Sequence, residues 1–324
     1  MMDLMKQSHP FFRVPFSLLT KISQAPYRFS LYQQEDSGHF KVLPREWVES
    51  NEFNLSSYKS SRSPLFISRE DKHSLIEFLG LQTGGLGDGF SKDQLQDSKH
   101  ILLPLTQIVC GEIQALLSQP LRDIFINAQP VLEQTVLDIA STTKGLSLML
   151  RLFYSHDYLL QHSFLVSALS FHLSQEIFTN AKDRKMIVQG ALLHDIGMLR
   201  IDEEIYVKAS LTEDDWEVMR AHPVIGEKML AELTDLDPGV LEIIAGHHSQ
   251  PNGRGYGKAG GKHAHLVGVI DAFSTMILPT PYRSLPRTPQ EALQLLKEDQ
   301  GHFERAYVEL IKDYLLTPHL KKAS

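Results

Sequence analysis

Short stretches of alternating polar and apolar residues fill the beginning of the chain, from about residue 11 to residue 81. Examples are FFRVPFSLL, YRFSLYQ and HFKVL, which are separated by proline, glycine or Asp-Ser breaks. Such alternation between turn residues predicts half-buried strands. A following stretch, SPLFISREDKHSLIEFL, reads as one more strand that runs into a helix. We therefore predict a small α+β accessory domain over residues 1–81.

The pattern changes after a glycine-rich segment, TGGLGDGFSKD, which predicts a flexible linker over residues 82–96. Beyond it, apolar residues recur at intervals of three and four, which is the period of an amphipathic helix. The helices predicted in this way cover residues 101–118, 121–139, 156–178 and 183–193. We expect connecting helices over residues 97–149 and an all-α bundle over residues 150–324, so the fold class is α+β overall.

Capping signals continue the helical prediction toward the C-terminus. Thr212 stands three residues before Asp215, as in a capping box, and predicts a helix that runs to His222, where a proline breaks or restarts it. The tripeptide Asp-Pro-Gly at residues 237–239 starts another predicted helix, VLEIIAGHH. Both helices therefore end in histidine.

Composition and charge narrow the classes of protein. The chain has 324 residues, which favours about two domains, and 42% of them are hydrophobic, which excludes wholesale disorder. The net charge of -7 provides no overall positive field for nucleic acid. The single cysteine, Cys110, cannot form an internal disulfide and fits a reducing compartment. No stretch resembles a signal peptide or a membrane span, so we expect a soluble cytoplasmic protein.

Histidines gather at predicted helix ends, with six of the 15 in residues 194–265. They and two carboxylates could form a set of metal ligands: His162, His194, Asp195, His222, His247, His248 and Asp271. Imidazole and carboxylate ligands suit divalent iron, manganese or zinc. Neighbouring residues on a helix point about 100° apart, so the adjacent pairs fit two ions better than one. Two ions about 3.5–4 Å apart are a recurrent device for hydrolysing phosphate esters.

Taken singly, each of these residues is more readily explained as structural. The chain contains a second His-Asp pair, His156-Asp157, that reads as an ordinary helix start. Only the order and the intervals of the whole set carry the inference.

The motifs follow one another in a fixed order: His162-Ser163, Ala191-Leu192-Leu193-His194-Asp195-Ile196-Gly197, Leu211-Thr212, His222-Pro223 with Gly226, His247-His248, Gly253, Gly255-Tyr256, Asp271 with Phe273, and Pro281-Tyr282-Arg283. In this order they resemble the HD-GYP domain, a bacterial branch of the HD phosphohydrolase superfamily, over residues 150–318. The segment before it resembles a small accessory domain often found ahead of HD-GYP domains. The resemblance implies an all-α bundle whose metal centre hydrolyses the second messenger cyclic di-GMP.

The resemblance also assigns roles. It makes all seven candidate residues metal ligands, with Asp195 as the bridging, catalytic carboxylate. Some members carry a glutamate that recruits a third metal; Tyr158 stands in its place here, so two ions, iron or manganese, are implied. Lys208, Tyr256 and Arg283 match positions that contact substrate. The signature loop of the family is matched here by Gly253, Gly255 and Tyr256. Arg254 adds positive charge to this loop, although a solvated basic loop is the alternative interpretation.

Three departures from the family pattern affect substrate capture. Met198 replaces a lysine that would contact phosphate, and Thr280 replaces an arginine. Gly257 replaces the proline of the signature, which predicts a looser loop. The metal site is complete while substrate capture is eroded.

We therefore expect a metal-dependent cyclic di-GMP phosphodiesterase of weakened activity, in which metal-activated hydroxide attacks phosphorus. Two alternatives stay open: a catalytically feeble nucleotide receptor or protein adaptor, and a hydrolase of another phosphate ester. The expected partners are cyclic di-GMP or a related nucleotide, and signalling proteins through the N-terminal domain or the signature loop. No DNA partner is expected.

Overall fold

The computed structural model describes residues 11–14, 28–35, 39–43, 65–72, 74–75, 77–78, 92–206, 208, 210–231, 236–280, 283, 285–299 and 301–316. The chain divides into two compact units. The first comprises Met1–Ala115 and Val136–Tyr154, and the second comprises Leu116–Thr135 and Ser155–Ser324. The described part of the predicted linker, from Lys92 onward, is already helical. The domain limits inferred from the sequence remain a prediction.

The first unit contains a four-stranded antiparallel sheet of order β1-β4-β2-β3. Its strands are β1 (Phe11–Arg13), β2 (Leu31–Gln34), β3 (Phe40–Val42) and β4 (Leu65–Ser68). Each lies within a stretch predicted to be a strand, and β4 leads into the 3-10 helix η2 (Arg69–Asp71). Leu65 and Ile67 point to one face and are fully buried, as the period of two requires. The α+β class is therefore confirmed.

Long helices complete the first unit and open the second: α5 (Lys92–Leu116), α6 (Leu121–Ile139) and α7 (Thr143–Tyr154). The cysteine in α5, Cys110, is free and buried. Of the helices that the structure describes, none is both long and apolar enough to cross a bilayer.

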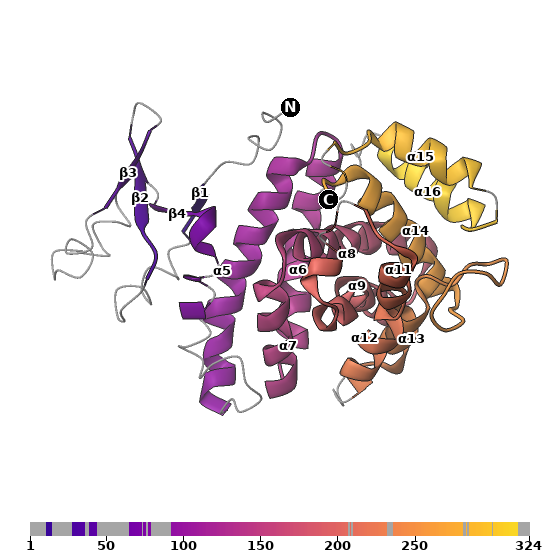
Figure 1. Cartoon of the computed structure of the whole chain (residues 1–324), viewed down its shortest axis with the longest axis horizontal. Coiled ribbons are helices and arrows are strands. Elements are labelled where there is room, and N and C mark those ends of the chain that lie inside the picture. The colour runs from indigo at the N-terminus through magenta and orange to yellow at the C-terminus, as the bar shows by residue number, and fades with distance from the viewer. Residues whose placement is uncertain are drawn as a thin grey trace. The chain divides into compact units, whose positions relative to one another are not determined.

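The second unit is a helical bundle (Figure 1). Its helices are α8 (Asp157–Ile177), α9 (Ala181–Leu193), η3 (Ile196–Arg200), α10 (Glu203–Tyr206), α11 (Glu213–Arg220), α12 (His222–Ala231), α13 (Pro238–Gly246), α14 (Lys262–Ile277), α15 (Pro289–Glu298) and α16 (Arg305–Leu316). Helix α8 packs against α9 and α14, and α13 packs against α9, α12 and α14. The predicted helices at 156–178 and 183–193 are confirmed, and the bundle core lies among these five helices.

Caps fix where the site-bearing helices begin. Asp215 donates its backbone N–H to Thr212 Oγ1 at 3.2 Å, and Thr212 N–H donates to Asp215 Oδ2 at 2.9 Å, so the predicted capping box opens α11. Asp237 caps α13 through the N–H of Gly239 at 3.0 Å, with a proline in the first turn.

Candidate metal centre

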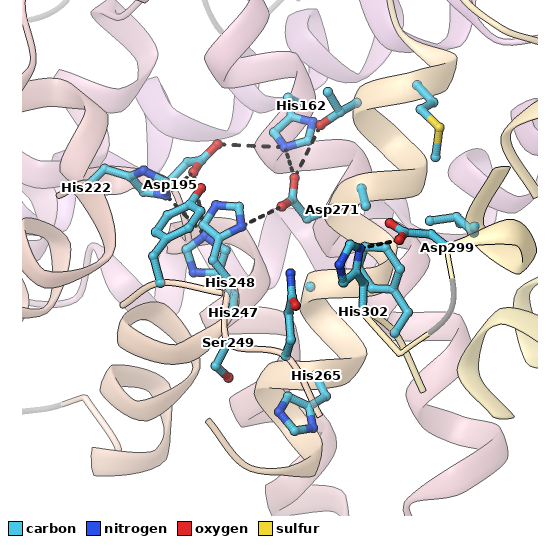
Figure 2. Close-up of a pocket in the computed structure, with 18 of the residues that line it drawn as sticks. His162, Asp195, His222, His247, His248, Ser249, His265, Asp271, Asp299 and His302 are labelled. Atoms are coloured by element: carbon cyan, nitrogen blue, oxygen red, sulfur yellow. Dashed lines mark hydrogen bonds and ion pairs between the residues drawn. The ribbon is translucent and has the colours of Figure 1, made fainter. Parts of the chain in front are cut away.

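The seven predicted ligands gather in the second unit in three overlapping sets. Six of them are labelled in Figure 2, and the seventh is His194. They come from helix ends and from two helix interiors. His194 and His247 are the residues at which α9 and α13 end, His222 is the first residue of α12, and Asp195 and His248 follow the two helix-ending histidines. His162 projects from α8 and Asp271 from α14. Residues 109 positions apart in the chain, His162 and Asp271, are thereby in contact.

Asp195 stands between two groups of histidines. Its Oδ1 atom lies 3.0 Å from His222 Nε2 and 3.9 Å from His247 Nε2. Its Oδ2 atom lies 3.3 Å from His194 Nε2 and 3.8 Å from His162 Nε2. One carboxylate oxygen therefore faces each group, which is the arrangement of a bridging ligand.

Asp271 is the second carboxylate of the centre. Its Oδ1 lies 3.0 Å from His162 Nε2 and 3.8 Å from His194 Nε2, and its Oδ2 lies 3.9 Å from His248 Nδ1. The side-chain donors form three sets compact enough to hold an ion: Asp195, His222, His247 and His248; His162, His194 and Asp195; and His194, His247 and Asp271. The cluster can therefore hold divalent metal.

Three histidines are oriented by their own helices. His194, His222 and His247 each place Nδ1 2.8 Å from the backbone carbonyl oxygen three residues earlier. A carbonyl only accepts hydrogen bonds, so each Nδ1 carries a proton, and Nε2 is the nitrogen left to bind a metal ion. That nitrogen is the one aimed into the centre, and fixing the far nitrogen in this way orients metal-binding histidines.

The packing of these nitrogens fits a cation. The Nε2 atoms of His222 and His247 lie 3.2 Å apart, so two lone pairs face each other unless a proton or a metal ion lies between them. His194 Nε2 is buried and forms no hydrogen bond of good geometry within the described part of the chain. A metal ion between His222 and His247 would satisfy both of their Nε2 atoms, and an ion beside His194 would satisfy its Nε2.

Charge in the centre has the sign that metal binding needs. Burial opposes ionisation of Asp195, but His194 and His222 hold its pKa well below the ordinary value. Burial lowers the pKa of His248 to about 4 and places that of His247 well below its usual range. Burial also disfavours charge on His194, yet Asp195 reverses this and raises its pKa to about 9. The carboxylates thus attract positive charge to the position that a metal would occupy.

The centre opens into a cavity of about 480 Å³. Six of the seven ligands line it, and the seventh, His194, is fully buried. An apolar wall beside them is formed by Leu159, Met198, Trp216 and Met219. The far side comes from α14 and the turn between α15 and α16, where Asp299 and His302 form an ion pair (Figure 2).

Of the four predicted substrate contacts, all within the described residues, only Tyr256 lines the cavity. Its ring stacks on His248 with centroids 4.3 Å apart. Lys208 instead donates to Asp215 Oδ1 at 2.7 Å, and Arg283 donates its Nη2–H to the backbone carbonyl of Thr275. The backbone N–H of Arg254, an exposed residue, donates to an asparagine side chain within the signature loop.

Sequence reasoning missed part of the cavity wall. His265, which is not among the predicted site residues, lines the cavity, and its Nδ1 lies 3.1 Å from Glu304 Oε1. His302 and Glu304 lie between α15 and α16, in a part of the predicted all-α bundle where no individual helix was located. The signal that could have found α15 is a second capping box, Thr288 with Glu291.

The signature loop is held by hydrogen bonds, contrary to the looser loop expected from Gly257. The N–H of Tyr256 donates to His248 O at 3.2 Å, and that of Lys258 to Ala245 O at 2.8 Å. Gly257 has φ 81°, and a Cβ there would lie 2.4 Å from Ala245 O. Proline fixes φ near −65°, so this backbone requires glycine.

Tyr158, at the position where a third-metal glutamate was considered, also lines the cavity. Its ring stacks on His162, with centroids 5.6 Å apart and planes 19° from parallel. It therefore supports the imidazole of a candidate ligand by packing.

Comparison with known proteins agrees with this geometry. Residues 159–276 match the HD domain family and contain all seven candidate ligands. The chain is 24% identical over 224 residues to a cyclic di-GMP phosphodiesterase of Pseudomonas aeruginosa, covering 64% of this chain and 54% of the relative. It is 30% identical over 136 residues to the cyclic di-GMP phosphodiesterase response regulator RpfG of Xanthomonas campestris, covering 40% and 36%.

A solved structure, Bd1817 of Bdellovibrio bacteriovorus, described as an HDG"Y"P protein, is similar over 94% of this chain and 98% of its own, with 19% identity and a TM-score of 0.46. The match to residues 159–276 shows an HD domain within the second unit. Within that class, the order of its motifs is similar to that of the HD-GYP family. It spans about half of the length of the first relative and about a third of the second.

Proposed function

We propose that this protein is a metal-dependent phosphodiesterase that hydrolyses cyclic di-GMP at a two-metal centre. The observation that carries the proposal is the position of Asp195, whose two oxygens face two separate groups of histidines. The names of the two relatives support the substrate class. Mixed imidazole and carboxylate donors favour iron or manganese.

The position of each candidate ligand indicates which of the two ions it would hold. His222, His247 and His248 would hold one ion with Asp195 Oδ1, so the adjacent histidines His247 and His248 would share an ion, contrary to the expectation that they serve two. His162, His194 and Asp271 would hold the other ion with Asp195 Oδ2. A bound pair of divalent ions supplies activation of water and neutralisation of the charge that develops on the phosphate. The buried helix-end histidines keep their bare nitrogens aimed at the centre without reorganisation.

The test combines metal analysis with product analysis on protein purified without oxygen or chelators. We expect about two iron or manganese ions per chain, and conversion of cyclic di-GMP to linear pGpG or GMP on a chromatogram. Bis(p-nitrophenyl) phosphate serves as a substrate that needs the metals but no nucleotide pocket. Protein that holds two ions and hydrolyses neither diester would show that the proposal is wrong.

A second candidate is a metal-containing nucleotide receptor or adaptor, or a hydrolase of another phosphate ester. It is favoured by the engagement of Lys208 with Asp215 and of Arg283 with a backbone carbonyl. Met198 carries no charge that could bind a phosphate, and it packs in an apolar cluster with Leu159. Saturable binding of cyclic di-GMP without turnover would favour the receptor, and hydrolysis of the synthetic diester alone would favour another substrate.

A further inference from the structure

An exposed tryptophan stands on the wall of the metal-bearing cavity. Trp216 lies in α11, is 41% exposed, and lines the same cavity as Asp195 and His222. Its indole is not needed to fill the bundle core, because α11 is largely exposed. A flat aromatic surface is therefore available beside the metal centre.

The ring is held in place by its own helix. The guanidinium carbon of Arg220 lies 5.9 Å from the Trp216 ring centroid, and Arg220 donates to Glu213 Oε1 at 2.8 Å. Glu213, Trp216 and Arg220 stand at helix positions i−3, i and i+4, which share one side. The cation packs on the ring, so less freedom is lost when a ligand stacks there.

The wall around this ring is apolar. Met198 belongs to a buried cluster with Leu159, and Met219 packs against that cluster. Leu159, Met198 and Met219 all line the cavity beside Trp216. This wall offers no charge to a phosphate, but a planar, weakly polar group fits it. In a cyclic dinucleotide that group is the nucleobase.

We propose that Trp216 stacks on one purine base of a cyclic dinucleotide whose phosphate lies at the metal centre. The inference rests on the proposed function and adds the residue that binds the base. Stacking of a base on an aromatic side chain changes affinity by roughly fivefold to a hundredfold. Because every purine has a π-face, this contact would bind the base without distinguishing guanine from adenine.

Tryptophan emission tests the contact directly. The chain has two tryptophans, so Trp47→Phe leaves Trp216 as the only one. We expect saturable quenching when metal-loaded protein is titrated with the phosphorothioate analogue of cyclic di-GMP, and no quenching by inorganic phosphate, which has no base. The proposal would be overturned if the radiolabelled analogue binds but Trp216 emission does not change. So would emission that changes only with protein concentration, since Trp216 would then contact a second copy.

Affinity of the variants supplies the second test. Trp216→Ala should weaken analogue binding by about fivefold to a hundredfold at unchanged metal content, and Trp216→Phe should retain most of it. Val218→Ala is the matched control, because Val218 is 44% exposed on the same helix and is absent from the residues described as lining the cavity. Equal affinity of wild type and Trp216→Ala would show that the proposal is wrong.

The outcomes separate this inference from the proposed activity. Quenching of Trp216 with no hydrolysis of cyclic di-GMP supports the stacking contact and contradicts the phosphodiesterase. Hydrolysis of cyclic di-GMP with no change in Trp216 emission supports the phosphodiesterase and contradicts the stacking contact.

Discussion

The two ends of one cavity differ in how firmly the sequence determines them. At the metal end, seven side chains predicted from motif order lie together, and three histidines are oriented by carbonyls of their own helices. At the substrate end, Tyr256 reaches the cavity, whereas Lys208 and Arg283 are engaged with other groups of the protein. The difference teaches that ligands fixed by local helix geometry can be read from spacing, but contacts made by long flexible side chains cannot.

The strongest test of the metal end is removal of the carboxylate common to two of the three sets. Asp195→Ala should lose both ions, because the two sets that its two oxygens face would each lose a charged ligand. His248→Ala should lose at most one, since His248 belongs to one set. Elemental analysis of purified protein measures both effects.

The control is Asp157→Ala in the other His-Asp pair, which lies at the start of α8 outside the cluster. Equal metal content in Asp195→Ala and wild type would mean that the centre has been assigned to the wrong residues.

Placing a positive charge at residue 198 tests the substrate end of the cavity. Met198→Lys should raise cyclic di-GMP turnover by about tenfold to a hundredfold, because a charge-assisted hydrogen bond contributes about 1.5–3 kcal/mol. Met198 lines the cavity and is 7% exposed, so a lysine stem can stay in the apolar cluster while its ammonium reaches the cavity. Steady-state kinetics at matched metal content measure the gain.

Met198→Leu is the isosteric control and should leave turnover unchanged. Adding Thr280→Arg would not help, because Thr280 is buried and its backbone pairs with that of Arg283, which would bring two guanidinium groups together. A folded, metal-loaded Met198→Lys protein without any gain would favour the receptor or another substrate.

The signature loop joins the two ends and gives a smaller, structural effect. Gly257→Pro should lower the free energy of unfolding by about 3 kcal/mol, because proline cannot adopt the positive φ of this position. Gly257→Ala should cost more than Gly253→Ala. Both glycines have positive φ, but a Cβ meets the Ala245 carbonyl only at Gly257. Urea denaturation compares the variants, and equal losses would show that the carbonyl contact does not matter.

The smallest expected effect concerns the ion pair between Lys208 and Asp215. Hydrogen bonds from Lys208 and Thr212 lower the pKa of Asp215 to about 2, so this carboxylate stabilises the fold above its unfolded pKa near 4 and loses that effect as pH falls toward 2. Lys208→Met should raise the pKa of Asp215, and its deficit in stability should be present at pH 7 and fade in acid. Carbon-detected NMR titration follows the carboxyl group.

Thr212→Ala provides the comparison, since it removes the hydroxyl hydrogen bond to Asp215 Oδ2 and leaves the one from the Thr212 backbone N–H. A Lys208→Met protein with an unchanged titration of Asp215 but weakened nucleotide affinity would show that Lys208 leaves the pair to bind substrate.

The sequence predicts the centre better than its surroundings for a physical reason. His194 and His247 are set by where α9 and α13 end, and those ends follow from apolar period and caps such as Asp237. Whether Arg283 reaches substrate depends on tertiary packing around Thr275, which no local pattern records. The cavity residues between α15 and α16 lie far along the chain from the histidine motifs, so motif spacing does not single them out.

The helix carbonyls that hold three imidazoles have a consequence for how this protein can vary. Ala191, Met219 and Ile244 supply these acceptors through their main chain, so no change of their side chains can delete the hydrogen bonds. Mutational robustness is thereby built into the reactive end, provided the helices persist. Substitutions in the cavity wall can then change which ligand binds while the metal centre keeps its geometry.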